Sequence, residues 1–221
     1  MNSRDTILQR IRAGLTGAAA AGFSGLTAPP VPEIWPQENP DKTVLAGRFA
    51  AELQAVFGET IRCATVEEAR RQLAALLGDA APGAVGAADT PLARDVAAAV
   101  APDRVVWAEP GWKPAAMAEL SAGLLTADCL LADTGTCLIA CRTDAERLLC
   151  YLPPTCIVLA RLEQLAKHLP AAWQEIACRC ADPQACGEFV LVTGPSRTAD
   201  IEKILILGVH GPKRLVVLLI D

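Results

Sequence analysis

From Asp41 onward, short apolar runs alternate with segments whose apolar residues recur at helical spacing. Continuous apolar runs of this kind are typical of strands that are buried on both faces. Strands separated by helices cannot pair as hairpins, so this order favours a largely parallel sheet with helices on both faces. The sequence therefore predicts an α/β fold, a mostly parallel open sheet flanked by helices.

Gly and Pro residues, together with the spacing of the apolar residues, set the expected boundaries. We expect helices over residues 45–56, 66–77, 92–100, 145–152, 162–177 and 199–207. The helix over residues 162–177 is expected to break at Pro170. We expect strands over residues 61–65, 84–87, 104–107, 129–131, 137–141, 156–160, 189–193 and 215–220. The best uncharged apolar runs, such as Gly123–Ala127, are strand-sized, and none reaches the roughly 18 to 20 residues that a transmembrane helix needs.

The first 40 residues have a different pattern. Ser3 can cap a helix whose apolar residues, among them Ile7 and Ile11, fall on one stripe. An Ala/Gly-rich segment follows, and then a proline-rich stretch from Pro29 to Pro40 that can form neither a helix nor a central strand. We therefore expect residues 1–40 to form an N-terminal helix and Pro-rich arm, and residues 41–221 to form one α/β domain. The arm can pack on its own domain or contact a partner, and the sequence favours neither.

Composition limits the partners and the compartment. The net charge of −5 lacks the Lys/Arg surplus that binding to a phosphate backbone requires, so we expect no nucleic acid partner. Nine scattered cysteines, in a chain long enough to fold without disulfides, indicate reduced thiols in the cytoplasm. The small-residue segment of the arm lacks the Leu-type hydrophobicity of a signal peptide. A soluble cytoplasmic protein is the expectation.

Three loops carry side chains suited to chemistry, and the first runs from Asp133 to Thr136. Gly135 permits a sharp turn, and the hydroxyls of Thr134 and Thr136 with the intervening amides can surround an anion. Asp133 would place a carboxylate beside it. An ordinary hairpin turn is the alternative.

The second loop begins at Gly194, after an expected strand and before the helix expected over residues 199–207. Free amides at a helix start, the hydroxyl of Ser196 and the planar guanidinium of Arg197 suit a carboxylate or phosphate. Asp200 and Glu202 oppose an anion, although acidic residues are also favoured in the first turn of a helix. If Thr198 simply caps that helix, only Arg197 lacks a structural explanation.

The third loop, Gly208–Pro212, holds His210 beside Gly211, where an imidazole can act as an acid, a base or a hydrogen-bond donor. A loop histidine that bonds helix carbonyls is the alternative. Ligands of open α/β sheets bind beyond the carboxyl ends of the strands, so we predict one pocket there, formed by the loops around Gly135, Arg197 and His210. The expected catalytic residues are Asp133, Glu202 and His210, and the expected ligand-binding residues are Thr134, Gly135, Thr136, Gly194, Ser196, Arg197, Thr198, Asp200 and Gly211.

No metal or cofactor is expected. The spacing of Cys178, Cys180 and Cys186 matches neither a zinc ribbon nor a ferredoxin run. Most of the cysteines are explained as small buried apolar residues.

The C-terminal motifs resemble those of the LUD-domain family, in particular its lactate-utilization protein C (LutC) branch. The segment GPSRTADIE, followed by GVHGP and a closing strand, carries the resemblance. Ala132–Thr136 looks like the family's acid-Thr-Gly-Thr turn, with Asp133 where many members carry Glu, and Leu152–Pro154 is similar to its Leu-Pro step. The resemblance covers roughly residues 120–221.

The resemblance implies a fold like that of the ribose-phosphate isomerase and CoA-transferase group, which hosts anionic ligands. It also implies a role in oxidising L-lactate to pyruvate alongside iron–sulfur partner proteins, without assigning a catalytic step to this component. Two alternatives stay open. One is a free-standing isomerase- or CoA-transferase-like enzyme acting on a phosphate or thioester through Asp133, Arg197, Asp200, Glu202 and His210. The other is a redox or metal protein using Cys178, Cys180 and Cys186. The sequence is also compatible with a homo-oligomer.

Overall fold

The computed structural model describes residues 3–20, 38–80, 83–180, 188–198 and 205–221. The chain forms two compact units, Met1–Asn39 and Pro40–Asp221. In the first unit residues 3–20 form the helix α1, Ser3–Ala20, on which Ile7 and Ile11 are exposed. No described helix combines the length and the apolar character needed to cross a membrane.

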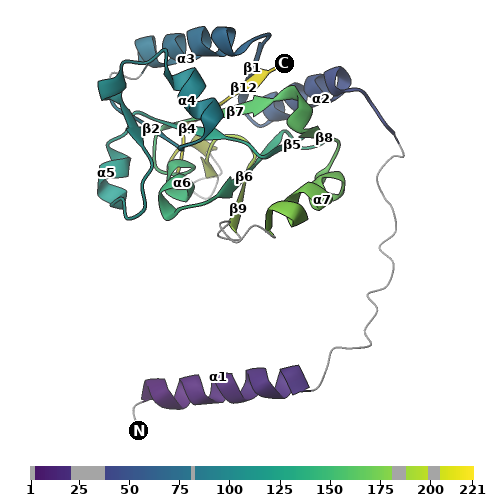
Figure 1. Ribbon diagram of the computed structural model, residues 1–221, viewed down its shortest axis with the longest axis vertical. Helices are drawn as coiled ribbons and strands as arrows, with labels where there is room; N and C mark the ends of the chain where they lie inside the picture. The colour runs from purple at the N-terminus through teal and green to yellow at the C-terminus, as the bar shows by residue number, and fades with distance from the viewer. Residues whose placement is uncertain (1–2, 21–37, 81–82, 181–187, 199–204) are drawn as a thin grey trace. The chain divides into compact units, whose positions relative to one another are not determined.

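The second unit contains all the other described elements (Figure 1). Its helices are α2 (Lys42–Ala55), α3 (Val66–Ala80), α4 (Pro91–Ala97), α5 (Pro114–Ala118), α6 (Asp144–Leu149) and α7 (Leu169–Cys180), with 3-10 turns at Pro102–Arg104 and Leu162–Gln164. Its strands are β1 (Glu59–Cys63), β2 (Val85–Ala87), β3 (Val105–Trp107), β4 (Ala122–Thr126), β5 (Cys129–Leu131), β6 (Thr136–Cys141), β7 (Thr155–Arg161), β8 (Leu165–Ala166), β9 (Glu188–Val192), β10 (Arg197–Thr198), β11 (Ile206–Leu207) and β12 (Arg214–Ile220).

The main sheet has six strands in the order β1-β12-β7-β4-β2-β3, and every neighbouring pair is parallel. The predicted α/β class with a mostly parallel open sheet is therefore confirmed. From β2 the chain moves outward to β3, returns to β4 on the other side of β2, and then proceeds through β7 to β12. The order of the strands thus reverses between β2 and β4, which is the topological switch point of the sheet.

A second, mixed sheet has the order β8-β5-β6-β9. Strands β5 and β6 form an antiparallel hairpin, so the turn that contains Gly135 is a hairpin turn. The helix expected over residues 162–177 is wrong in its first part, where the structure has a 3-10 turn and strand β8. Leu165 and Ala166 pair in parallel with Leu130 and Leu131, and this main-chain pairing delays the helix until Leu169.

The expectation of a helix over residues 199–207 is wrong for residues 206 and 207, which the structure describes. Ile206 and Leu207 form strand β11, which pairs antiparallel with Arg197 and Thr198 of β10. Thr198 is therefore a strand residue and not a helix cap, and residues 199–204 lie outside the described part. Gly208 closes this ribbon with a φ of 73° while its N–H donates to the carbonyl of Ser196.

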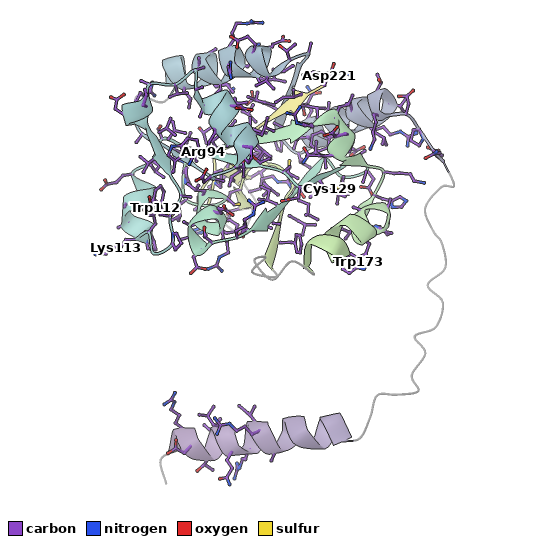
Figure 2. The ribbon with its side chains drawn as sticks, in the orientation of Figure 1. Arg94, Trp112, Lys113, Cys129, Trp173 and Asp221 are labelled. Carbon is purple, nitrogen blue, oxygen red and sulfur yellow. The ribbon has the colours of Figure 1, made fainter. Side chains whose placement is uncertain are left out.

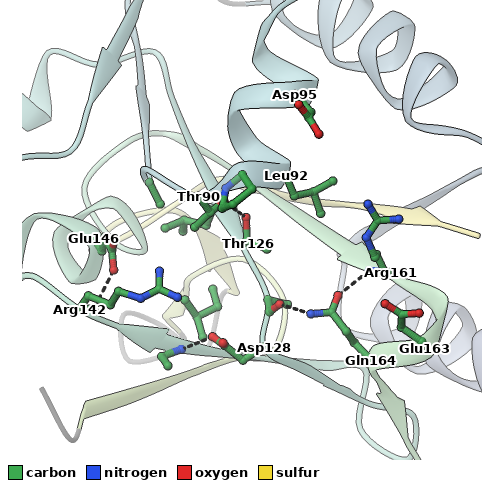
Figure 3. Close-up of a pocket in the computed structure, with 16 residues that line it drawn as sticks. Thr90, Leu92, Asp95, Thr126, Asp128, Arg142, Glu146, Arg161, Glu163 and Gln164 are labelled. Atoms are coloured by element: carbon green, nitrogen blue, oxygen red, sulfur yellow. Dashed lines mark hydrogen bonds between the residues drawn. The ribbon is translucent and has the colours of Figure 1, made fainter. Parts of the chain in front are cut away.

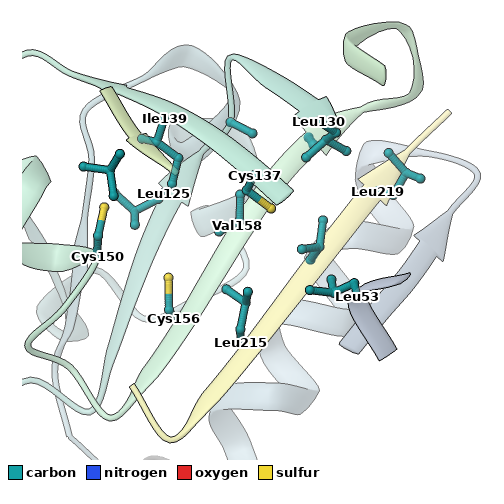
Figure 4. Packing of buried hydrophobic residues seen from close by; sticks show 14 of the residues in the cluster. Leu53, Leu125, Leu130, Cys137, Ile139, Cys150, Cys156, Val158, Leu215 and Leu219 are labelled. Carbon is teal, nitrogen blue, oxygen red and sulfur yellow. The ribbon is translucent and has the colours of Figure 1, made fainter. Parts of the chain in front are cut away.

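The apolar core lies on both faces of the main sheet. One face packs against α3 and α4, through residues such as Leu73 and Val96. The other face packs against α2, α5, α6 and the small sheet, and here Cys137, Cys150 and Cys156 lie among leucine and valine side chains (Figure 4). The far side of the small sheet is covered by α7, whose Trp173 points away from the core (Figure 2).

Candidate functional site

A cavity of about 310 Å³ lies at the carboxyl ends of β2, β4 and β7 (Figure 3). We call it the switch pocket, because β2 and β4 flank the point where the strand order reverses. Open α/β sheets bind their ligands at this place. Its wall is formed by Ala88, Thr90, Pro91, Leu92, Asp95, Leu125, Thr126, Ala127, Asp128, Ile139, Ala140, Arg142, Glu146, Arg161, Glu163 and Gln164.

Two threonine hydroxyls meet inside the switch pocket. Thr126 ends β4, and its Oγ1 lies 2.7 Å from Oγ1 of Thr90, the residue that caps α4. The Thr90 hydroxyl also accepts a hydrogen bond from the main-chain N–H of Ala93 at 3.2 Å. Both hydroxyls are therefore held in place by the first turn of α4 and the end of β4.

The loop that carries Thr90 is braced by Arg94, one turn into α4. Arg94 donates to both carboxylate oxygens of Asp89, at 2.5 and 2.7 Å, and this pairing holds the pKa of the Asp89 carboxyl below its ordinary value. The guanidinium of Arg94 also lies over the ring of Trp107 in β3, 4.6 Å from the ring centroid. The brace thus ties the loop after β2 to the end of β3.

Main-chain N–H groups hold two carboxylates in the pocket wall. Glu146, in α6, is 6% exposed and accepts from the N–H of Arg142 at 2.6 Å. Asp128, after β4, accepts from the N–H of Ala140 at 2.7 Å. These acids keep fixed positions without a ligand, because the backbone of the small sheet and of the loop before α6 orients them.

Arg161 ends β7 on the opposite wall. Its main chain is fixed by Gln164, whose Oε1 accepts from the Arg161 N–H at 2.5 Å and whose Nε2 donates to the carbonyl of Ala127 at 2.6 Å. The guanidinium of Arg161 has no hydrogen-bond acceptor or ion-pair partner among the described residues. Its main chain is thus held in place, and its permanently charged guanidinium is available to an anion.

The loops that the sequence singled out come together at the other end of the sheet. A chain of hydroxyls runs from Thr134 through Thr136 to Thr193, with Oγ1–Oγ1 distances of 2.8 and 2.7 Å. Gly135 packs on the backbone of α2 at Leu53, and Gly194 packs on Val56 just beyond the end of that helix. The first two predicted loops are therefore neighbours.

A second cavity, of about 190 Å³, involves four of the predicted residues, and we call it the loop pocket. It is lined by Cys150, Tyr151, Cys156, Val190, Leu191, Val192, Thr193, Gly194, Ser196, His210, Gly211, Pro212 and Leu215. The main chain of Ser196 joins its loops, since its N–H donates to the carbonyl of Pro212 at 2.9 Å.

The expected position of this pocket is wrong. It lies at the amino ends of β7 and β12, where Cys156 and Leu215 stand at the second position of their strands. The reason is topological. His210 and Gly211 precede β12, and a loop before a parallel strand lies at its amino end. Ser196 follows β9, which belongs to the small sheet and not to the main one.

Several predicted residues lie outside both cavities. Arg197 is exposed on β10, and Asp133 is exposed in the hairpin turn, where its carboxylate accepts from the Thr134 hydroxyl at 3.3 Å. Neither residue lines the switch pocket or the loop pocket, and the same holds for Thr198. Asp200 and Glu202 lie outside the described residues.

No group of three or more His, Cys, Asp or Glu side chains within the described ranges is placed to hold a metal ion. Cys178 and Cys180 end α7 without a described side chain, and Cys186 lies outside the described residues.

Sequence reasoning missed the residues of the switch pocket. A signal was present, because Asp89 and Thr90 directly follow one apolar run and Asp128 directly follows another, Gly123–Ala127. What the sequence does not carry is the order of the strands, which makes β2 and β4 neighbours.

The fold and the cavity define an open-sheet α/β protein with a ligand-sized pocket at its topological switch point. The family model of the LUD domain matches residues 46–220, so the chain belongs to the LUD domain family, as its motifs predict.

Among its relatives, lactate utilization protein C of Bacillus pumilus is 36% identical over 95 residues, 42% of this chain and 40% of that protein. Lactate utilization protein C of Anoxybacillus flavithermus is 34% identical over 90 residues, 41% of this chain and 39% of that protein. An uncharacterized protein of Neisseria meningitidis is 30% identical over 109 residues, 49% of this chain and 46% of that protein. The chain thus spans less than half the length of these curated relatives.

The fold has a counterpart of known structure. A crystal structure of a duf162 family protein from Deinococcus radiodurans superposes with a TM-score of 0.64 at 20% identity, over 83% of this chain and 100% of that chain. At this identity the likeness shows the shared fold alone.

Proposed function

We propose that this chain is a component of an L-lactate utilization system, that it acts with iron–sulfur partner proteins, and that it binds a small anionic ligand. The observation that carries the proposal is the similarity to relatives named lactate utilization protein C, at 30–36% identity. Two structural features support the proposal of an anionic ligand. A preformed cavity lies at the switch point, and the guanidinium of Arg161 in its wall has no partner among the described residues.

Several residues predicted from the sequence line the loop pocket or lie on loops near it, and the proposal includes them. Gly194, Ser196 and Gly211 line the loop pocket with His210, and the hydroxyl chain from Thr134 to Thr193 leads to it. We propose the loop pocket as a second ligand-binding place, with His210 as the residue able to exchange a proton. Asp133, Thr136, Arg197 and Thr198 stay candidates on the neighbouring described loops, and Asp200 and Glu202 stay candidates from the sequence alone.

The experiment is deletion of the gene in its source organism, followed by growth on L-lactate and on glucose. We expect loss of growth on lactate alone, restored by the wild-type gene, and copurification of iron–sulfur proteins with the tagged chain. Normal growth of the deletion strain on L-lactate as the only carbon source would overturn the proposal.

A further inference from the structure

We infer that the switch pocket is a binding site for a small monocarboxylic acid with an oxygen on the carbon next to the carboxylate, a 2-hydroxy or 2-oxo acid. Arg161 binds the carboxylate, and the Thr90–Thr126 hydroxyl pair binds the neighbouring oxygen. The inference deepens the proposed function and rests on it only for the expectation that lactate or pyruvate is among these acids.

Arg161 is the group suited to a carboxylate. Its guanidinium is planar, permanently charged and able to form two parallel hydrogen bonds with a carboxylate. Gln164 fixes the main chain of Arg161, so the side chain starts from a rigid point. Since no described residue pairs with the guanidinium, the ligand does not have to displace a protein carboxylate.

The hydroxyl pair lies at the right place for the second oxygen. Thr126 is in register with Leu159 of β7, and Arg161 lies two residues further along that strand. Alternation then puts the side chains of Thr126 and Arg161 on the same face of the sheet, with Cα atoms about 8 Å apart. A short acid can therefore reach both groups.

The chemistry of the pair fits both oxidation levels of the ligand. Either hydroxyl can donate in the hydrogen bond between Thr90 and Thr126. Together they can accept from a ligand hydroxyl or donate to a ligand carbonyl. A 2-hydroxy acid and the corresponding 2-oxo acid are thus both accommodated.

The acidic residues of the wall limit the charge of the ligand. Asp95, Asp128, Glu146 and Glu163 line the same cavity as the two arginines, Arg142 and Arg161. Carboxylates near a bound anion repel it, and the repulsion grows with the charge of the anion. The lining therefore favours a monoanion over a dicarboxylate or a phosphate ester.

The test is titration calorimetry on the purified full chain with L-lactate and pyruvate. Three comparison compounds each change one feature: propionate lacks the 2-oxygen, lactamide lacks the carboxylate, and malate adds a second carboxylate. We expect each to bind at least about tenfold more weakly than the better of lactate and pyruvate, the loss expected for one charge-assisted hydrogen bond. Equal binding of propionate or malate, or no binding of lactate and pyruvate, would overturn the inference.

Two variants locate the binding. Arg161→Gln and Thr126→Val are expected to weaken binding about tenfold. Arg71→Gln, an exposed arginine on α3, and Thr60→Val, a strand threonine whose buried hydroxyl has no described partner, are the matched controls and should leave affinity unchanged. If Arg161→Gln does not fold, Arg161→Lys keeps the charge and removes the planar fork. Wild-type affinity in a folded Arg161 variant would refute the assignment.

Binding and growth separate the two proposals. If the acids bind through Arg161 but the deletion strain grows normally on lactate, the proposed role in lactate utilization is wrong and the assignment of the switch pocket is supported. If growth on lactate requires the gene but the acids do not bind, the assignment of the switch pocket is wrong and the proposed role in lactate utilization is supported.

Discussion

Gly135 shows how one residue fixes the contact between the small sheet and α2. Its φ is 62°, and a Cβ there would overlap the backbone nitrogen of Leu53. Any side chain must therefore push the hairpin turn away from the helix, in addition to the backbone strain of the left-handed conformation.

We predict that Gly135→Ala lowers the free energy of unfolding by about 2 kcal/mol or more, because left-handed strain and overpacking add. Gly47→Ala is the matched control, because Gly47 lies in α2 and a Cβ added there would meet no atom within 4 Å. It should raise stability by about 0.5 to 1 kcal/mol, since alanine is the better helix former. Urea unfolding measures both, and equal effects of the two changes would contradict the packing argument.

At the scale of elements, the longest-range strand pairing carries an ion pair. Glu59 of β1 accepts two hydrogen bonds from Arg214 of β12, at 2.6 and 2.7 Å. The hydrogen bonds from Arg214 hold the pKa of the Glu59 carboxyl below its ordinary value. Stability from this pair is present above the ordinary glutamate pKa and is lost as the pH falls through the lowered one.

We predict that Glu59→Gln destabilises the protein at pH 7 by up to about 1 kcal/mol, a modest value because both side chains are partly exposed. The difference from wild type should shrink below pH of about 4 and vanish once Glu59 is protonated. Glu67→Gln, which breaks an i,i+3 pair with Arg70 on α3, is the control. A Glu59→Gln penalty that stays constant from pH 7 to pH 3 would show that the pair is not its cause.

The elements also show what the sequence could predict. The continuously apolar runs 156–160 and 215–220 predict strands, because burial on both faces leaves a local signal, and the structure has β7 and β12 there. Leu165–Ala166 and Ile206–Leu207 were assigned to helices, because a strand of two residues has no period and exists only through its partner. For the same reason the motif loops could be found in the sequence, but not the end of the sheet at which they lie.

At the scale of the whole molecule, the two cavities lie at opposite ends of one parallel sheet. Ligand-binding loops after β2, β4 and β7 could be expected from the rule for open sheets, whereas their convergence depends on the strand order. The residues of the switch pocket come from segments as distant as Ala88 and Gln164. Such convergence has no signature in any one segment of the sequence.

The described thiols are distributed through the core and share one property. Cys63, Cys129, Cys137, Cys141, Cys150 and Cys156 are all buried and free of disulfides. Burial raises the pKa of Cys63 to about 11 and that of Cys156 to about 12, and it also raises the pKa of Cys137. The thiolate, which is the reactive form, is therefore scarce in the native state at neutral pH.

We predict that iodoacetamide at pH 7.5 leaves these six cysteines unmodified in the native chain and modifies all six after unfolding in urea. Peptide mapping by mass spectrometry distinguishes them from Cys178, Cys180 and Cys186. Rapid modification of Cys156 in the native chain would contradict its burial between the main sheet and the small sheet.

Because β12 lies between β1 and β7 in the sheet, β1 cannot pair with it until β12 has been synthesised. Among the described strands, β1 has only β12 as a neighbour in the sheet, and their register joins Glu59 to Val216. A ribosome that adds roughly 5 to 20 residues per second needs on the order of 10 to 30 s to travel from one to the other. Throughout that interval β1 lacks its described partner, while β2, β4 and β7 can pair with one another as soon as each has been made. The nascent chain therefore depends on β12 to pair with β1, and a pause in translation between these two strands prolongs the time in which β1 can pair with the wrong partner.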